Sequence, residues 1–301
     1  MSVTRDMGRD VRVTVLGISQ DGGFPQAGCN SNCCEPVKKN PALSKHPVSL
    51  GIIGLDGSKH LIEATRDLAW QLNLWNSIDP SENKLASLWI THAHHGHIDG
   101  LGLFGREVIN SKNLNVYCSD KLSNLIKNTP NWNLLIELEN IEIKTFESSE
   151  YYALSPECGF SIKPIEVPHR AELSDMHAFL IKGPNKTLLF LPDHDAWVST
   201  LDFVNKNTII DWLNSEHIDI ALIDGTFWST NELVNRAQKI IPHPTVSETL
   251  QRIGEKRVID PEIKFTHLNH TNPLYYESSD EYKQVEKMGW GVTKEGEFFN
   301  L

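Results

Sequence analysis

Four of the chain's 13 histidines fall within six residues, in the stretch Thr91-His92-Ala93-His94-His95-Gly96-His97-Ile98-Asp99-Gly100. This stretch directly follows Ser87-Leu88-Trp89-Ile90, an apolar run that predicts a buried strand. A strand that ends in a histidine-rich loop can direct several imidazoles at one borderline cation such as Zn²⁺. The alternative is a solvated loop that is rich in histidine by chance, but four histidines behind one buried strand favour a metal site.

Three further apolar runs each lead to a polar residue that can ligate a metal. These runs and the residues that follow them are 162–167 with His169, 187–191 with Asp193, and 263–265 with His267. Each residue alone is explained equally well as a capping aspartate or a surface histidine. Because strand ends that meet at one edge of an open α/β sheet form its sites, the repeated pattern predicts that all three join the loop histidines.

The composition excludes several classes of protein. The chain has 301 residues, of which 40% are hydrophobic, so it can bury a sizeable core and is not disordered. Its 28 Lys and Arg against 39 Asp and Glu give a net charge of −11, which argues against broad electrostatic binding of nucleic acid or an anionic membrane. We therefore expect a small-molecule substrate and no nucleic-acid or membrane partner, and no pattern predicts an oligomeric state.

The N-terminal residues 1–17 are polar and charged, unlike a secretory signal. No window reaches the roughly 20 apolar residues that span a bilayer. The five cysteines do not form the evenly spaced framework of a disulfide-rich secreted domain. These features predict a cytoplasmic protein, unless a native export signal has been trimmed from the sequence.

Short apolar runs and helical patterns alternate along the chain without a break in composition. Strands are predicted at residues 11–16, 49–53, 60–62, 87–90, 115–118, 141–146, 162–167, 178–181, 187–191, 218–223 and 263–265. Helices are predicted at residues 67–76, 121–127, 204–214, 230–240, 246–254 and 280–287. We expect one α/β domain over residues 1–301, with a flexible segment at residues 1–10 and two packed sheets covered by helices.

The order His92-x-His94-x-x-His97, followed by His169, Asp193 and His267, resembles the metallo-β-lactamase superfamily. This resemblance implies a four-layer αββα sandwich. More closely, the chain is similar to the pyrroloquinoline quinone biosynthesis protein B (PqqB) family. The matching stretches are Gly22-Gly23-Phe24-Pro25-Gln26, Asp224-Gly225-Thr226-Phe227-Trp228 and His267-Leu268-Asn269-His270-Thr271-Asn272-Pro273.

The superfamily pattern implies a role for each of these residues. It implies that the first metal is held by His92, His94 and His169, that Asp193 bridges two metals, and that His97 and His267 hold the second metal. The family pattern has an aspartate before the last loop histidine, where this chain has Gly96, so the second metal is in question. Glu63 stands where the superfamily often has a carboxylate that orients the ligand loop, although an ordinary strand-end acid explains it too.

Asp224 and His243 resemble the proton-shuttle pair of the phosphodiesterases and tRNA-end-processing nucleases of this superfamily. Asp224 follows an apolar run, and His243 follows in Ile241-Pro242-His243-Pro244-Thr245. A carboxylate beside an imidazole favours the protonated form that a general acid needs. A capping turn with a packed histidine is an equally good explanation.

Three cysteines lie within Cys29-Asn30-Ser31-Asn32-Cys33-Cys34. A closed structural zinc site needs a fourth ligand, and His270 is the candidate because related phosphodiesterases of phosphonate metabolism use a histidine at this offset. The usual spacing is C-x-C-x-x-C, whereas Ser31 replaces the second cysteine here. Either Cys33 substitutes as a ligand or the site has lost one arm. We expect a structural zinc rather than buried free thiols.

These residues predict a metal-dependent hydrolase that attacks a small phosphodiester or related ester. In this hypothesis one or two Zn²⁺ ions, or Fe or Mn, occupy the histidine site, and Asp193, Asp224 and His243 are the catalytic residues. One alternative is a PqqB-like iron-dependent oxygenase in quinone cofactor biosynthesis, since a histidine-rich site with one carboxylate also suits Fe(II). A non-catalytic metal-binding protein is the other, because fold does not fix function.

Overall fold

Two mixed sheets form the centre of the computed structural model, which describes residues 10–81, 83–170, 172–233 and 241–301. Within these ranges the first sheet has the strand order β13-β1-β2-β3-β4-β5-β6, and the second has the order β12-β11-β10-β9-β8-β7. The first sheet contains β1 (Arg12–Gly17), β2 (Ser49–Ile53), β3 (Lys59–Ile62), β4 (Leu85–Trp89), β5 (Leu114–Cys118), β6 (Ile141–Thr145) and β13 (Phe298–Asn300). The second contains β7 (Ser161–Val167), β8 (Met176–Lys182), β9 (Thr187–Leu191), β10 (Ile220–Asp224), β11 (Glu262–Thr266) and β12 (Gly291–Val292).

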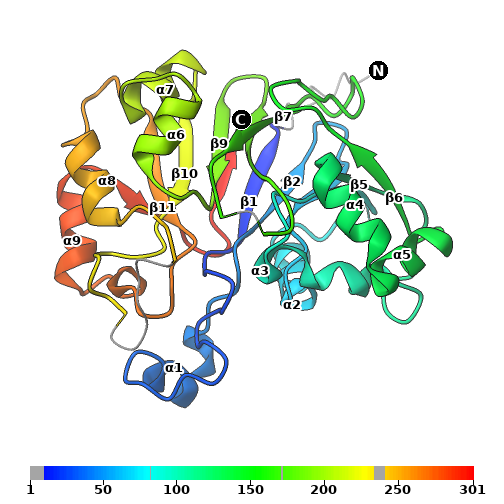
Figure 1. Ribbon diagram of the computed structural model, residues 1–301, viewed down its shortest axis with the longest axis horizontal. Coiled ribbons are helices and arrows are strands. Elements are labelled where there is room, and N and C mark those ends of the chain that lie inside the picture. The colour runs from blue at the N-terminus through cyan, green and yellow to red at the C-terminus, as the bar shows by residue number, and fades with distance from the viewer. Residues whose placement is uncertain (1–9, 82, 171, 234–240) are drawn as a thin grey trace, which may run out of the picture.

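Three hydrophobic clusters show how the layers pack. The first lies between the sheets, where Val13 and Ile52 of the first sheet share a core with Phe190 of the second. A second cluster joins the outer face of the first sheet to α2, α4 and α5, and a third joins the outer face of the second sheet to α6–α9. Figure 1 shows these two groups of helices on opposite sides of the paired sheets. The order of layers is therefore helix, sheet, sheet, helix, as the sequence predicts.

The helices within the described residues are mostly short. Their bounds are α1 (Glu35–Lys39), α2 (Leu68–Ile78), α3 (His95–Ile98), α4 (Asp120–Asn128), α5 (Pro130–Glu137), α6 (Trp197–Phe203), α7 (Ile209–Ser215), α8 (Val246–Ile253) and α9 (Asp280–Lys287). Side chains of Ser119, Thr208, Thr245 and Ser279 cap the N-termini of α4, α7, α8 and α9 by accepting backbone N–H bonds. The described helices are not long and apolar enough to cross a membrane.

One predicted helix is wrong as drawn from the sequence. The helix predicted at residues 204–214 begins too early, because residues 204–208 are not helical and α7 begins at Ile209. The helix before it, α6, was not predicted from the sequence. Asn205 has a positive φ of 54°, which a helix interior does not allow, and Thr208 then caps a new helix. Of the predicted helix at 230–240, residues 230–233 are a turn and irregular backbone, and residues 234–240 lie outside the described residues.

The strand arrangement explains why distant residues meet. Strands β9, β10 and β11 are parallel, so their carboxyl ends lie at one edge of the second sheet. Strand β7 is antiparallel to β8, which is antiparallel to β9, so β7 also ends at that edge. Loops from this edge and from the end of β4 meet at the lower side of the sandwich, beside the segment that carries α1 (Figure 1).

Candidate metal centre

Six predicted ligands converge where these strands end. His92 and His94 follow β4, and His97 lies in the short helix α3. The ligating atoms of His92, His94 and His169 lie within 4.8 Å of one another, as do those of His92, His97 and Asp193. Asp193 Oδ2 lies 3.1 Å from His97 Nε2 and 3.3 Å from His267 Nε2. Asp193 is therefore the central carboxylate of the group. His95, by contrast, is exposed and pairs with Asp99 outside it.

Threonine hydroxyls fix the tautomers of two imidazoles. Thr91 Oγ1 donates to Glu63 Oε1, so its lone pair accepts Nδ1–H of His92 at 2.8 Å. Thr226 Oγ1 donates to the carbonyl of His267, so it accepts Nδ1–H of the same imidazole at 2.9 Å. In both histidines the Nε2 lone pair is left facing the centre, which is the arrangement that metal ligation needs.

Carboxylates hold the remaining imidazoles from outside. Glu63 Oε1 lies 3.1 Å from His97 Nδ1, and Asp195 Oδ1 lies 3.2 Å from His169 Nδ1. The imidazole of His94 has the opposite orientation. Its Nε2 lies 3.3 Å from a carboxylate oxygen of Glu172, and its Nδ1 lies 3.3 Å from His169 Nε2. Glu63 thus lies where the resemblance implies, behind the ligand loop.

The atoms that face the centre suit a cation. Among the residues that the structure describes, Nε2 of His92, His97 and His267 and Oδ2 of Asp193 are buried without a hydrogen-bond partner. Buried polar atoms of this kind are rare because each costs about 1–3 kcal/mol. A divalent ion would satisfy all of them at once, so the donor set fits a metal.

Charge in the centre is strongly coupled. Burial disfavours charge on Asp193, but the neighbouring His267, His97 and His169 hold its pKa well below its ordinary value. Burial similarly opposes protonation of His97, yet Glu63, Asp193 and Asp21 raise its pKa well above 6.5. Without a cation, these carboxylates therefore keep a proton on His97 that a metal would displace.

The backbone is strained at two residues of this centre. Glu63 and His267 have φ values of 72° and 59°, in the left-handed region that residues other than glycine seldom adopt. Such conformations cost of order 1–3 kcal/mol and concentrate at functional sites. Here they turn both side chains inward directly after β3 and β11.

Asp224 and His243 also meet at this edge. Asp224 is the last residue of β10 and is fully buried. His243 Nδ1 donates to Asp224 Oδ2 at 2.7 Å and lies 3.6 Å from Asp193 Oδ1. Burial lowers the pKa of His243, but the charge and hydrogen bond of Asp224 outweigh it and raise the pKa to about 9.

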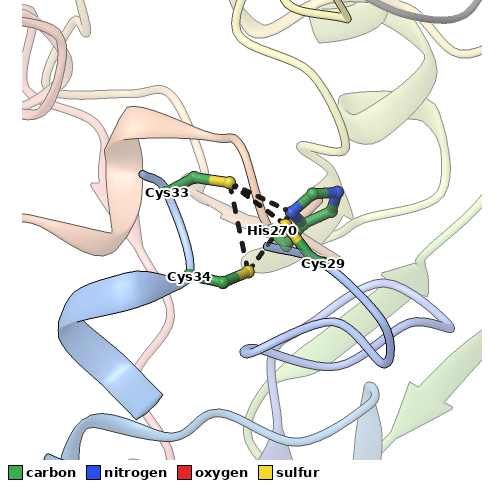
Figure 2. A group of neighbouring side chains, drawn as sticks. All are labelled: Cys29, Cys33, Cys34 and His270. Carbon is green, nitrogen blue, oxygen red and sulfur yellow. Dashed lines mark hydrogen bonds between the residues drawn. The ribbon is translucent and has the colours of Figure 1, made fainter. Parts of the chain in front are cut away.

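The cysteine cluster has the dimensions of a zinc site. Cys29 Sγ lies 3.7 Å from Cys33 Sγ, which lies 4.0 Å from Cys34 Sγ (Figure 2). His270 Nδ1 lies 3.4 Å from the sulfurs of both Cys33 and Cys34. A tetrahedral zinc with bonds of about 2.3 Å to sulfur and 2.0 Å to nitrogen spaces its ligands by roughly 3.8 Å for sulfur pairs and 3.6 Å for sulfur–nitrogen pairs. Cys33 therefore stands as the third thiol, and Ser31 is not needed.

Asp21, like Asp195 and Glu172, lies beside the centre but was not predicted from the sequence. Asp21 Oδ1 lies 3.3 Å from His97 Nε2 and 3.7 Å from His267 Nε2. It comes from the loop after β1, directly before the stretch Gly22-Gly23-Phe24-Pro25-Gln26. Its position after an apolar strand is the same signal that singled out Asp193, and this signal could have found it.

A family model described as the beta-lactamase superfamily domain matches residues 59–267, so the chain belongs to this superfamily. A curated relative, coenzyme PQQ synthesis protein B of Bradyrhizobium diazoefficiens, is 25% identical and covers 95% of this chain and 98% of its own. The resemblance to the PqqB family is thereby confirmed.

Solved structures confirm the fold. The chain is similar to Zn²⁺-bound PqqB from Methylobacterium extorquens, with a TM-score of 0.74, 19% identity, and coverage of 96% of this chain and 100% of that one. It is also similar to a diphosphatase from the PhnP family, with a TM-score of 0.68, 18% identity, and coverage of 97% and 98%. The four-layer αββα sandwich predicted from the sequence is therefore the fold of this chain.

Proposed function

We propose that the chain is a metal-dependent hydrolase of a small phosphodiester or related ester. The observation that carries this proposal is the convergence on the buried carboxylate of Asp193 of the Nε2 atoms of His92, His97 and His267, none of which makes a hydrogen bond to another described residue. A divalent ion bound by such a set lowers the pKa of water and polarises the oxygen of the bond to be cleaved.

His243 is the proton donor in this proposal. Because its pKa is raised to about 9, it is protonated at neutral pH, and Asp224 keeps Nδ1–H engaged so that the proton on Nε2 can be given away. His243 gives that proton to the leaving oxygen as the ester bond breaks. The attacking water adds its hydroxyl to phosphorus or to the carbonyl carbon, and its other proton restores His243.

A cleft beside the centre has room for a small substrate. It has a volume of about 1220 Å³, and its lining includes Asp21, Arg66 and Phe227. The exposed guanidinium of Arg66 suits an anionic group of the substrate.

We propose Zn²⁺ for the histidine centre, with Fe or Mn as the alternatives, and a structural Zn²⁺ for the cysteine cluster. Imidazole and carboxylate ligands suit all three metals, whereas three thiols with one imidazole select zinc. The similarity to Zn²⁺-bound PqqB from M. extorquens supports Zn²⁺ in the histidine centre.

A second candidate is a PqqB-like iron-dependent oxygenase. The match to coenzyme PQQ synthesis protein B over 95% of the chain favours it. Both candidates use the same ligands, so the metal and the co-substrate distinguish them. Turnover that requires Fe(II), oxygen and a reductant would replace the hydrolase proposal with this one.

The test is hydrolysis of chromogenic phosphodiesters and lactones by protein loaded with Zn²⁺, Mn²⁺ or Fe(II) under nitrogen. We expect turnover that chelators abolish and that His92→Ala with His94→Ala removes together with bound metal. His95→Ala is the matched control for metal content, since this exposed neighbour lies outside the centre and should leave the bound metal unchanged. Full metal loading with no turnover of any ester would favour a non-catalytic metal-binding protein.

A further inference from the structure

Gly96 stands where the superfamily pattern has a carboxylate, and Asp21 occupies the space that its side chain would need. A Cβ added to Gly96 would lie 2.4 Å from Asp21 Oδ1, 2.6 Å from its Cα and 2.7 Å from its Cγ. Because one of these atoms belongs to the backbone, rotation of the Asp21 side chain cannot relieve the overlap. The position of the loop that carries Asp21 therefore excludes a side chain at residue 96.

The carboxylate of Asp21 points at the ligands of the second metal. Its Oδ1 and the Nε2 atoms of His97 and His267 lie within 4.8 Å of one another. All three atoms are buried and, among the described residues, have no hydrogen-bond partner.

Backbone hydrogen bonds hold Asp21 in register with His267. The N–H of Gln20, directly before Asp21, donates to the carbonyl of Leu268 at 2.8 Å. The N–H of Leu268 donates in turn to the carbonyl of Ile18 at 2.8 Å. This two-way pairing fixes the loop after β1 against the residue that follows His267, so the position of Asp21 is built into the fold.

We propose that Asp21 is a ligand of a second divalent metal, together with His97, His267 and Asp193, and that it replaces the carboxylate missing at Gly96. The centre then holds two metals, and its second carboxylate comes from the N-terminal loop instead of the histidine loop. The inference rests on the metal-dependent centre of the proposed function. It concerns metal binding and does not depend on which reaction follows.

Removal of the Asp21 carboxylate tests this assignment. The metal content of wild type and Asp21→Gly is measured by elemental analysis after equilibration with Zn²⁺, and Co²⁺ titration by absorbance counts the sites. We expect Asp21→Gly to bind one metal fewer than wild type, with affinity for the second metal weakened by more than about 100-fold, the loss that even outer-sphere changes can reach.

Two further variants keep the test decisive. Asp21→Asn preserves the shape of the side chain, so loss of the metal in this variant too assigns the effect to charge rather than to folding. Asp99→Asn, at an exposed neighbouring aspartate, should bind as wild type does. Equal metal content in wild type, Asp21→Gly and Asp21→Asn would overturn the proposal. If the Asp21 variants lose the second metal as expected while no ester is cleaved, the ligand assignment stands and the hydrolase proposal falls.

Discussion

Zinc uptake by the cysteine cluster is expected to release protons. Burial raises the pKa of Cys34 to about 12, and burial together with the neighbouring Cys29 raises the pKa of Cys33 above its ordinary value. Both thiols therefore hold their protons throughout the range from pH 6 to pH 8. Zinc binds the thiolate, so both protons must leave when the metal enters.

The number of protons sets the size of the effect. Each released proton makes zinc binding more favourable by about 1.36 kcal/mol per pH unit. Two protons therefore give about 2.7 kcal/mol per pH unit in the wild-type protein. Cys33→Ser removes one of these thiols, so its dependence should be smaller by about 1.4 kcal/mol per pH unit. Any proton from Cys29 contributes to both proteins and cancels in the difference.

The measurement is competition for zinc with a chromogenic chelator at several values between pH 6 and pH 8. The histidine centre contributes equally to wild type and Cys33→Ser, so their difference reports the cysteine cluster. A matched control adds Ser31→Cys to Cys33→Ser, which restores three thiols in the usual C-x-C-x-x-C spacing and should restore the steep pH dependence. Identical pH dependence in wild type and Cys33→Ser would refute the reasoning.

Three other outcomes follow from the contacts. Glu63→Gln should weaken metal binding by about 10- to 100-fold, because the carboxylate of Glu63 lies 3.1 Å from His97 Nδ1 and orients that imidazole. Competition with a chelator measures the metal affinity, and an affinity equal to that of wild type contradicts the prediction. Asp224→Asn should lower the pKa of His243 from about 9, so the loss of activity at alkaline pH should begin at lower pH, and an unchanged pH profile counts against the proton-donor role. Burial lowers the pKa of His60 to about 4, so the unfolded chain takes up a proton between about pH 6.5 and pH 4 that the folded chain does not. Stability should therefore fall by about 2 kcal/mol from pH 7 to pH 5 through this group, and urea unfolding of His60→Gln should show that dependence removed.

Periodicity and strand ends were sufficient to predict most of the fold and of the centre. An apolar run followed by a polar residue placed His169, Asp193 and His267 correctly at one edge, because β9 and β11 run parallel and β7 shares their direction. The start of α7 was misplaced and α6 was missed, although the segment between them, Asn205-Lys206-Asn207-Thr208, is wholly polar. Both helices have only 7 residues. Short helices offer too few turns for periodicity to locate their ends.

The role of Asp21 depends on a contact that local sequence does not contain. From the sequence alone, Gly96 indicates a missing metal ligand. The structure shows that the loop after β1 lies against Gly96, and backbone hydrogen bonds between residues 18–20 and Leu268 hold that loop in place. The substitution of Cys33 for the cysteine expected at residue 31 is similar. Its thiol reaches His270 only because the loop after β11 lies beside the N-terminal loop.

The two metal-binding groups share the same pair of segments. The loop after β1 carries Asp21 and then the three cysteines, and the loop after β11 carries His267 and then His270. Tyr275 reinforces the connection, since its ring stacks on Phe24 at 4.1 Å and its hydroxyl donates to the carbonyl of Leu268 at 2.6 Å.

A metal in the cysteine cluster would therefore cross-link the two loops that bring Asp21 and His267 together. In the superfamily pattern this carboxylate directly precedes the last loop histidine, where this chain has Gly96. In this chain the carboxylate comes from another segment, so its distance from His267 depends on how firmly the two loops are joined.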